Sequence, residues 1–389
     1  MPALKQENFK IARDTKGKSP AGEDPVLRKP RILVAPLDWG LGHATRCIPI
    51  INGLSALDCD VWLAGDGAQE ELLKLEFPQL RFLSLPGYRV KYGQSRIALL
   101  WNMLVQSPRI LKMIRHEHEW LEEKINDYSF DAVISDNRYG LYHPTVPCVF
   151  ITHQLAIKSP FGKWSEVLLR KRNYSYISRF TECWIPDVQQ GPGLSGELSH
   201  PAKKPSIPLK YLGPLSRMEM IDGVSAGFDT DLLIILSGPE PQRTLLEEII
   251  INDIAHYPGR AIVVRGLPGS LQLIPSTNTI KFYNHLSAPE LNIEMNRAGY
   301  VISRSGYSTI MDIVKLGKKS ILIPTPGQTE QEYLGRYLHE KKAALCIPQK
   351  GFSLSSALQA AKSFSYSLPV LNEPGLETVL AQFVGSISK

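Results

Sequence analysis

The amino-acid sequence predicts an α/β protein made of two tandem Rossmann-like domains, each built on a parallel sheet. Three observations lead to this fold class. Short apolar runs typical of buried parallel strands alternate with helical segments over residues 31–151. A second series of the same kind begins at residue 232, and a stretch rich in proline and glycine at 186–226 separates the two series.

The first domain is predicted to cover residues 31–213. Residues 1–30 are rich in Lys, Glu, Pro and Gly without sustained periodicity, which is typical of a disordered leader. Ordered sequence starts at Arg31 with a short apolar strand that ends in a glycine-containing turn. The expected strands are 32–36, 61–64, 80–85, 132–135 and 148–151, and the expected helices are 46–57, 68–75 and about 97–126.

The second domain is predicted to cover residues 214–389, with its last helix crossing back to the first domain. The connection between the domains includes one short strand near Leu209. The expected strands of the second domain are 232–236, 261–265, 279–282, 300–302 and 320–323. The two halves show no close sequence repeat, so their similarity is one of architecture only.

The composition excludes several classes of protein. A formal net charge of +6 over 389 residues fits an anionic small substrate or weak attraction to anionic lipid, and does not indicate nucleic acid binding. The five cysteines form no CxxC pair, so we expect neither a zinc site nor disulfides, and a cytoplasmic protein. No apolar run approaches the roughly 18–20 residues that span a bilayer, so any membrane contact would be peripheral, at the inner face of the cytoplasmic membrane.

The first candidate site is the turn Asp38–Arg46, which follows the first predicted strand. Gly40 and Gly42 let the backbone approach a ligand, and the following helix supplies free N–H groups and a positive dipole end. That positive end should lower the pKa of His43, and a neutral imidazole can accept a proton from a hydroxyl. The alternative is that His43 only caps or packs the turn.

The second candidate site follows the predicted strand 300–302. Ser305 and Gly306 open a helix whose N-terminus can hold phosphate, and Arg304 lies just before them. Asp312 lies about two turns further along and can accept hydrogen bonds from a ribose. From the chemistry of the sequence alone, the alternative that Asp312 is a solvated helix residue is favoured.

Together these residues resemble the MurG-like glycosyltransferases of the family 28 type. The resemblance rests on the glycine loop with His43 and on the block Arg-Ser-Gly…Asp…Pro…Gln that begins at Arg304. It implies the GT-B fold, in which two Rossmann-like domains face each other across a cleft. It also implies a nucleoside-diphosphate sugar as donor, with UDP as the nucleotide, bound mainly by the second domain.

The resemblance assigns roles to individual residues. Asp312 corresponds to the acidic residue that holds the ribose hydroxyls. Gln331 and Glu332 correspond to a pair of glutamines that contact the donor sugar, and Glu332 departs from that pattern. Because a carboxylate accepts hydrogen bonds but donates none, this departure leaves the identity of the sugar open.

Further donor contacts are implied at two loops of the second domain. The segment 282–286, with Tyr283 and Asn284, matches the place where the family reads the base through its backbone. Ser237 and Gly238 match a loop that contacts the diphosphate, although the family's richer glycine run is missing. The glycines Gly40 and Gly42 complete the implied nucleotide-sugar site from the first domain.

The implied reaction is an inverting transfer in which His43 removes the acceptor's proton. Ser305, Gly306 and Arg304 would stabilise the leaving diphosphate, without a metal or a cofactor beyond the donor itself. Thr45 and Arg46 would be available for phosphate or acceptor contacts. The candidate sugar is N-acetylglucosamine, and the candidate acceptor is a lipid-linked or cell-envelope glycan.

Two other functions stay open at the level of the sequence. Nucleotide-sugar hydrolases of nonulosonic acid biosynthesis carry a similar turn with His, Arg and Cys, as in His43–Cys47, and would use the histidine to activate water. The chain is alternatively a non-catalytic nucleotide-sugar-binding protein.

Three further segments have more than one interpretation. Asp229–Asp231 has the form of a metal-binding DxD, but it precedes a strand instead of following one, so we interpret it as a solvated linker. Residues 161–172 combine apolar and basic side chains, and 96–115 are similar. Such stretches either lie on anionic lipid or turn an apolar stripe toward the core.

Overall fold

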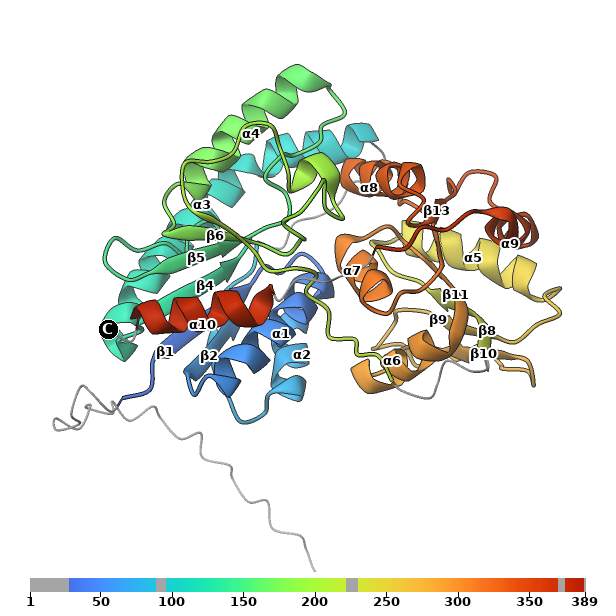
Figure 1. Ribbon diagram of the computed structural model, residues 1–389, viewed down its shortest axis with the longest axis horizontal. Helices are drawn as coiled ribbons and strands as arrows, with labels where there is room; N and C mark the ends of the chain where they lie inside the picture. The colour runs from blue at the N-terminus through green and yellow to red at the C-terminus, as the bar shows by residue number, and fades with distance from the viewer. Residues whose placement is uncertain (1–27, 89–95, 222–229, 370–374, 388–389) are drawn as a thin grey trace, which may run out of the picture.

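The computed structural model describes residues 28–88, 96–221, 230–369 and 375–387. Residues 1–27 of the predicted leader lie outside this range. Figure 1 shows the first half of the chain and the second half as two lobes, each with a sheet between helices. This arrangement confirms the predicted fold class, two Rossmann-like domains with parallel sheets.

The first sheet has seven strands in the order β3-β2-β1-β4-β5-β6-β7, and every pair is parallel. Its strands are β1 (Arg31–Pro36), β2 (Asp60–Gly65), β3 (Arg81–Ser84), β4 (Ala132–Asp136), β5 (Cys148–Ile151), β6 (Glu182–Ile185) and β7 (Leu209–Tyr211). Its helices are α1 (Leu41–Ala56), α2 (Ala68–Glu76), α3 (Arg96–Tyr128), α4 (Lys163–Ile177) and the 3-10 helix Gly196–Leu198.

The second sheet has six parallel strands in the order β10-β9-β8-β11-β12-β13. Its strands are β8 (Thr230–Ile235), β9 (Ala261–Val264), β10 (Ile280–Tyr283), β11 (Ala298–Ser303), β12 (Ser320–Leu322) and β13 (Leu345–Cys346). The helices of this half are α5 (Gln242–Ile254), α6 (Ala288–Arg297), α7 (Tyr307–Lys315), α8 (Thr329–Glu340), α9 (Leu354–Ser363) and α10 (Leu376–Ile387).

Strand β1 illustrates why apolar runs predicted the sheets. Ile32 and Val34 belong to the core on one face of the sheet, and Leu33 and Ala35 belong to the core on the other face. All four side chains are fully buried. A parallel sheet covered by helices on both faces needs apolar residues at every position, so the strand reads as a continuous run.

The structure differs from the sequence-based expectation at the start of α1. The helix begins at Leu41, five residues before the predicted start, because Gly40 adopts a positive φ of 79° that ends the turn immediately. His43 and Arg46 therefore lie in the first two helical turns. Strands β6 and β13 were missed, and β13 is only two residues long.

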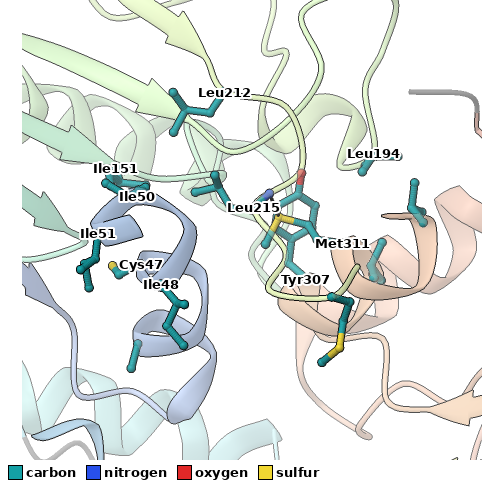
Figure 2. Close-up of a cluster of buried hydrophobic side chains, with 14 of the residues drawn as sticks. Cys47, Ile48, Ile50, Ile51, Ile151, Leu194, Leu212, Leu215, Tyr307 and Met311 are labelled. Atoms are coloured by element: carbon teal, nitrogen blue, oxygen red, sulfur yellow. Dashed lines mark hydrogen bonds between the residues drawn. The ribbon is translucent and has the colours of Figure 1, made fainter. Parts of the chain in front are cut away.

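The two halves meet through one continuous apolar core. Figure 2 shows Leu215, from the connection between the domains, between the α1 side chains and Met311 and Tyr307 of α7. Helix α10 returns to the first half, where Phe383 packs edge-on against Trp184 at a ring-centroid distance of 5.2 Å. The relative placement of the two sheets is thus held by burial as well as by the chain connection.

Each sheet reverses its strand order at one point. In the first sheet the chain leaves β1 toward β2 and β3 and then resumes at β4, on the other side of β1. In the second sheet the same happens between β8 and β11. In such sheets the crevice at the carboxyl ends of these two strands is where ligands bind, so the loops after β1, β4, β8 and β11 are the places to examine.

Candidate functional site

A buried cluster of polar side chains lies at the reversal point of the first sheet. His43 Nδ1 lies 3.1 Å from Asp136 Oδ2, at the end of β4. Arg46, one helical turn after His43, donates to both oxygens of the same carboxylate, with Nε at 2.7 Å from Oδ2. Asp136 is fully buried and Arg46 is 3% exposed, whereas the side chain of His43 is 15% exposed. Of these three side chains, the imidazole is the one that is accessible to solvent.

Burial and charge set the ionisation of this cluster. Burial lowers the pKa of His43, and the neighbouring Arg46 guanidinium lowers it further, which outweighs the opposite effect of Asp136. Burial acts to raise the pKa of Asp136, but Arg46 and His43 outweigh it and bring the value down to about 2. The cluster therefore contains a neutral imidazole between a carboxylate and a guanidinium at neutral pH.

The contacts of His43 Nδ1 decide what its other nitrogen can do. Asp136 only accepts hydrogen bonds, whereas Arg46 Nη2, at 2.7 Å from Nδ1, only donates them. When Nδ1–H donates to Asp136, Nε2 carries a free lone pair and is a base. Asp136 therefore favours the tautomer in which Nε2 is the base, whereas a hydrogen bond from Arg46 to Nδ1 favours the opposite tautomer.

The cluster continues across the domain boundary. His153, just after β5, lies 3.4 Å from Arg46 through Nδ1, and its Nε2 lies 2.7 Å from Glu330 Oε1 in the first turn of α8. The ring of His153 stacks on Tyr307 of α7 at a centroid distance of 4.2 Å. Partial burial acts to raise the pKa of Glu330, but His153 outweighs it and holds that pKa below its ordinary value. These contacts join the polar cluster of the first domain to two helices of the second.

The two glycines of the first turn have different roles. Gly40 needs its positive φ, and its carbonyl accepts a hydrogen bond from Gln69 Nε2 at 3.0 Å. Gly42 lies against the second domain, since a Cβ there would be 2.7 Å from Ser308 Oγ. Ser308 donates to the carbonyl of Gly42 at 3.1 Å. The amino ends of α1 and α7 therefore meet at this contact, which brings two positive helix ends together.

At the reversal point of the second sheet, three loops converge after β8, β11 and β12. Ser237 and Gly238 form the first, and Gly238 has a positive φ of 106°. Gly306, the residue before α7, has open space where a Cβ would lie. The hydroxyl of Thr325 lies about 3.6 Å from the Cβ position of Gly238, is buried, and has no hydrogen-bond partner among the described residues. A buried hydroxyl without a partner is costly, so the loops are arranged for a further polar group.

The side chains of Arg304 and Ser305 form hydrogen bonds within the protein. Arg304 is 1% exposed and donates to the backbone carbonyls of Gln242, Ile323 and Pro324. Burial lowers the pKa of Arg304 to about 10. Ser305 donates its hydroxyl to the carbonyl of Gln331 at 2.8 Å. These side chains hold the three loops in place, which differs from the direct diphosphate contact expected from the sequence.

Asp312 is held in a second buried polar group. Its Oδ1 accepts a hydrogen bond from Ser216 Oγ at 2.6 Å. Burial raises the pKa of Asp312 to about 6, and Ser216 and Arg217 oppose that rise. The side chain of Arg217 is 14% exposed, and its Nε is buried without a partner in the described structure. Burial lowers the pKa of His285, and the charge of Arg217 lowers it further. Since Arg217 acts on both Asp312 and His285, this cation lies between the ribose and base positions expected from the sequence.

Tyr283 and Asn284 lie at the end of β10, two strands away from the reversal point. Tyr283 is exposed, and its carbonyl accepts from Arg265 N at 2.8 Å. The side chain of Asn284 bonds to Arg265 and to the carbonyl of Ser270, both at 2.7 Å. The Asn284 side chain therefore shapes the loop after β10.

Gln331 and Glu332 lie in the first turn of α8. Gln331 Oε1 accepts from the backbone N–H of Thr325 at 2.9 Å, and Glu332 Oε1 accepts from that of Gly327 at 2.9 Å. Both side chains thus brace the loop between β12 and α8. Their neighbours Thr329 and Glu330 are the residues of this turn that reach the first domain, Thr329 by donating to the carbonyl of Lys158 at 3.2 Å.

The predictions outside these loops can also be placed. Arg46 is not available for phosphate, as its guanidinium is 3% exposed and paired with Asp136, so that expectation was wrong. Asp231 accepts from Arg260 N at the amino end of β8, opposite the site, and Asp229 lies outside the described residues. In the described part of the chain, no three His, Cys, Asp or Glu side chains converge to hold a metal ion.

The amphipathic stretch 161–172 includes most of α4, and its large apolar side chains are exposed. Phe161 is 52% exposed, Trp164 69% and Leu168 62%. The alternative of a core-facing stripe is therefore wrong for this segment. Much of the similar stretch 96–115 lies outside the described side chains. Among the helices that the structure covers, none combines the length and hydropathy of a membrane-spanning segment.

Five residues of this site were missed in the sequence: Asp136, His153, Arg217, Thr325 and Glu330. Asp136 directly follows the predicted strand 132–135, and His153 lies two residues after the predicted strand 148–151, at the carboxyl edge that carries ligands in parallel sheets. That position was a usable signal for both. Arg217 lies in the connection between the domains, where no local pattern marks it.

Comparison with known proteins supports the resemblance noted in the sequence. Residues 279–368 match the glycosyltransferase family 28 C-terminal domain. A curated relative from Haemophilus ducreyi, UDP-N-acetylglucosamine–N-acetylmuramyl-(pentapeptide) pyrophosphoryl-undecaprenol N-acetylglucosamine transferase, is 28% identical over 131 residues, 32% of this chain. The matched region spans about a third, 36%, of that relative's length.

Solved structures share the fold over nearly the whole chain. The glycosyltransferase SnogD from Streptomyces nogalater superposes with a TM-score of 0.61 at 12% identity, covering 92% of this chain and 100% of that one. MurG from Acinetobacter baumannii gives a TM-score of 0.54 at 12% identity, covering 92% and 99%. The predicted GT-B fold is thus confirmed, and the MurG-like resemblance rests on the family 28 match and the curated relative.

Proposed function

We propose that this chain is a glycosyltransferase that moves a sugar from a UDP-sugar to an acceptor hydroxyl, with inversion at the anomeric carbon. The observation that carries this proposal is the convergence of the two sheet reversal points. One supplies loops with an unpartnered buried hydroxyl, and the other supplies the His43–Asp136 pair. The two meet where Ser308 bonds to Gly42.

The donor would bind at the loops after β8, β11 and β12. Gly238 and Gly306 admit a diphosphate close to the backbone, and Thr325 offers it a hydroxyl. The amino end of α7 adds a positive dipole to stabilise the charge that develops on the leaving group. Asp312 and Arg217 would hold the ribose and the base, with Arg217 using its free Nε.

The first domain would present the acceptor. With Nδ1–H donated to Asp136, His43 Nε2 accepts the acceptor's hydroxyl proton as the new C–O bond forms. The bond between the anomeric carbon and the diphosphate breaks at the same time, and UDP leaves with the bonding electrons. Attack from the side opposite the diphosphate inverts the anomeric configuration.

Donor binding is tested by replacing two residues that each carry a buried polar atom without a partner, Thr325 through its hydroxyl and Arg217 through its Nε. Thr325→Val removes a hydroxyl and should weaken UDP binding about 2- to 10-fold, while Arg217→Met removes a cation and should weaken it about 10- to 100-fold. Isothermal titration with UDP and with UDP-N-acetylglucosamine measures both. Thr277→Val, on an exposed loop away from the site, is the matched control. UDP affinities equal to wild type in both site variants would remove the donor assignment.

We further propose that α4 rests on the inner face of the cytoplasmic membrane and gives access to a lipid-linked or envelope glycan acceptor. Phe161, Trp164 and Leu168 are exposed apolar side chains next to Lys163 and the basic run 170–172. Apolar insertion and attraction to anionic lipid act together on such a surface.

Vesicle sedimentation tests this surface. We expect the protein to bind vesicles containing phosphatidylglycerol, and Trp164→Ser with Leu168→Ser to reduce that binding at least tenfold without changing UDP affinity. Leu271→Ser, a 97% exposed residue of the second domain, is the control. Equal sedimentation of the wild type and the double variant would rule out this contact.

A further inference from the structure

Arg217, in the connection between the domains, pairs with a carboxylate of the first domain. Its Nη1 lies 3.5 Å from Oε1 of Glu76, the last residue of α2. The side chains of Arg217 and Glu76 are 14% and 30% exposed. The guanidinium that we assign to the donor is therefore already shared with the first domain.

The chain on both sides of Arg217 is fixed to the second domain. Ser216, just before it, donates to Asp312 of α7 at 2.6 Å. The backbone N–H of Glu219, two residues after it, donates to the side chain of Asn292 in α6 at 3.0 Å. Arg217 thus belongs to the second domain in its contacts, and its ion pair with α2 crosses from one domain to the other.

Arg217 also acts on the residues at the nucleoside end of the proposed donor site. Burial is the largest effect on the pKa of Asp312 and of His285, and the charge of Arg217 acts on both groups. Among the described residues, its Nε is buried without a hydrogen-bond partner. An unpaired buried N–H is costly, so this guanidinium gains a hydrogen bond if its contacts change when a ligand binds.

Glu76 is poorly placed to stabilise its own helix. A carboxylate in the last turn of a helix lies at the negative end of the helix dipole, which is unfavourable. Its pair with Arg217 is long and partly exposed, and ion pairs of this kind contribute little to the free energy of unfolding. Stability therefore leaves the charge of Glu76 unexplained, and its effect on Arg217 remains as its role.

One guanidinium cannot serve two anions fully. The Glu76 carboxylate compensates part of the positive charge that would attract the nucleotide. A guanidinium that turns toward the nucleotide in turn gives up contact with α2. Nucleotide binding and this contact between the domains are then linked, and each weakens the other by the same factor.

We propose that Glu76 and the nucleotide compete for Arg217, so that the position of the first domain sets the affinity for the donor and for UDP. Donor binding loosens the contact at α2, and the ion pair that forms again after transfer favours the release of UDP. This inference rests on the proposed function, because it takes Arg217 as a ligand of the nucleotide.

A double-mutant cycle measured by isothermal titration with UDP tests the competition. Glu76→Gln should bind UDP about 3- to 10-fold more tightly than the wild type, because Arg217 loses its competing partner. In an Arg217→Met background the same change should alter the affinity less than about twofold. Glu70→Gln is the matched control: Glu70 lies on the same helix, pairs with Lys74 at 2.6 Å, and its replacement should leave UDP affinity unchanged.

Unchanged or weaker UDP binding in Glu76→Gln would overturn the inference. An equal gain in the Arg217→Met background or in Glu70→Gln would also overturn it, because such a gain reflects general repulsion between carboxylates and the diphosphate. If the wild type binds UDP and one of these results appears, only this inference fails. If the wild type does not bind UDP, the proposed function fails and this inference with it.

Discussion

Glu330 of the second domain and His153 of the first lie 2.7 Å apart, and this contact joins α8 to the polar cluster around Arg46. The two residues are 177 positions apart in the chain. Glu330 directly precedes Gln331 and Glu332, the two residues expected at the donor sugar. The contact therefore connects the approach of the two domains to the part of the site proposed for the donor.

Replacing Glu330 by Gln should loosen this closure. The uncharged amide leaves Arg46 and His153 with less compensating charge, and a hydrogen bond to a charged group contributes about 1.5–3 kcal/mol. We expect a lower melting temperature and a larger radius of gyration in small-angle X-ray scattering without UDP. Glu340→Gln, an exposed position at the end of the same helix, should change neither. An unchanged radius in Glu330→Gln would show that the contact does not hold the domains together.

The activity should have an acidic limb set by His43. Burial and Arg46 lower the pKa of this imidazole below 6.5, and the base is the neutral form. The rate should therefore rise with pH, with its midpoint below pH 6.5, and then level off. Because the pKa of His43 is lower in the folded protein than in the unfolded chain, the unfolded chain binds the proton more readily. The free energy of unfolding therefore decreases as pH falls below 6.5. A midpoint of kcat/KM above pH 7 would contradict this assignment.

Asp136→Asn should abolish most turnover while sparing donor binding. An amide in this place donates to Nδ1 and selects the tautomer with a proton on Nε2, which is not a base. By analogy with other His–Asp pairs, kcat should fall on the order of 10³- to 10⁴-fold. Cys47→Ala is the matched control, since its thiol contacts the same carboxylate at 3.8 Å. A loss of less than tenfold in Asp136→Asn would remove the pair from the mechanism.

Gly42→Ala should disturb the meeting point of α1 and α7. The new Cβ would lie 2.7 Å from Ser308 Oγ, so the hydroxyl must turn away and its bond to Gly42 is lost. We expect a higher donor KM and a lower melting temperature. The double variant with Ser308→Ala removes the clashing oxygen and should recover most of the melting temperature. Equal defects in the single and double variants would show that this close approach is not the cause.

The fold was predictable because its signal is local. The runs 32–36 and 232–236 are apolar at every position, as a strand covered on both faces requires, and they appear as β1 and β8. The start of α1 was placed late because glycines at 40 and 42 look like a longer turn. Gly40 alone makes that turn, and Gly42 is already helical.

The site was predictable only in part, because its decisive contacts are not local. His43 stood out by its place in a glycine turn, but its partner Asp136 is 93 residues away and reaches it through the pairing of β1 with β4. Arg304 stood out as a cation beside a phosphate-type loop. Arg304 instead donates hydrogen bonds to three backbone carbonyls. These bonds depend on how the loops after β8 and β12 pack, which no sequence pattern reveals.

The most direct test of the central claim measures UDP release and glycosylated product together. The protein is incubated with a panel of UDP-sugars, with and without a lipid and glycan extract, and products are followed by mass spectrometry. We predict that one UDP-sugar gives UDP only with the extract, that one sugar is added to an acceptor, and that His43→Ala abolishes both while binding UDP like the wild type. Release of UDP with an equal amount of free sugar in the absence of extract, or wild-type turnover in His43→Ala, would contradict the account.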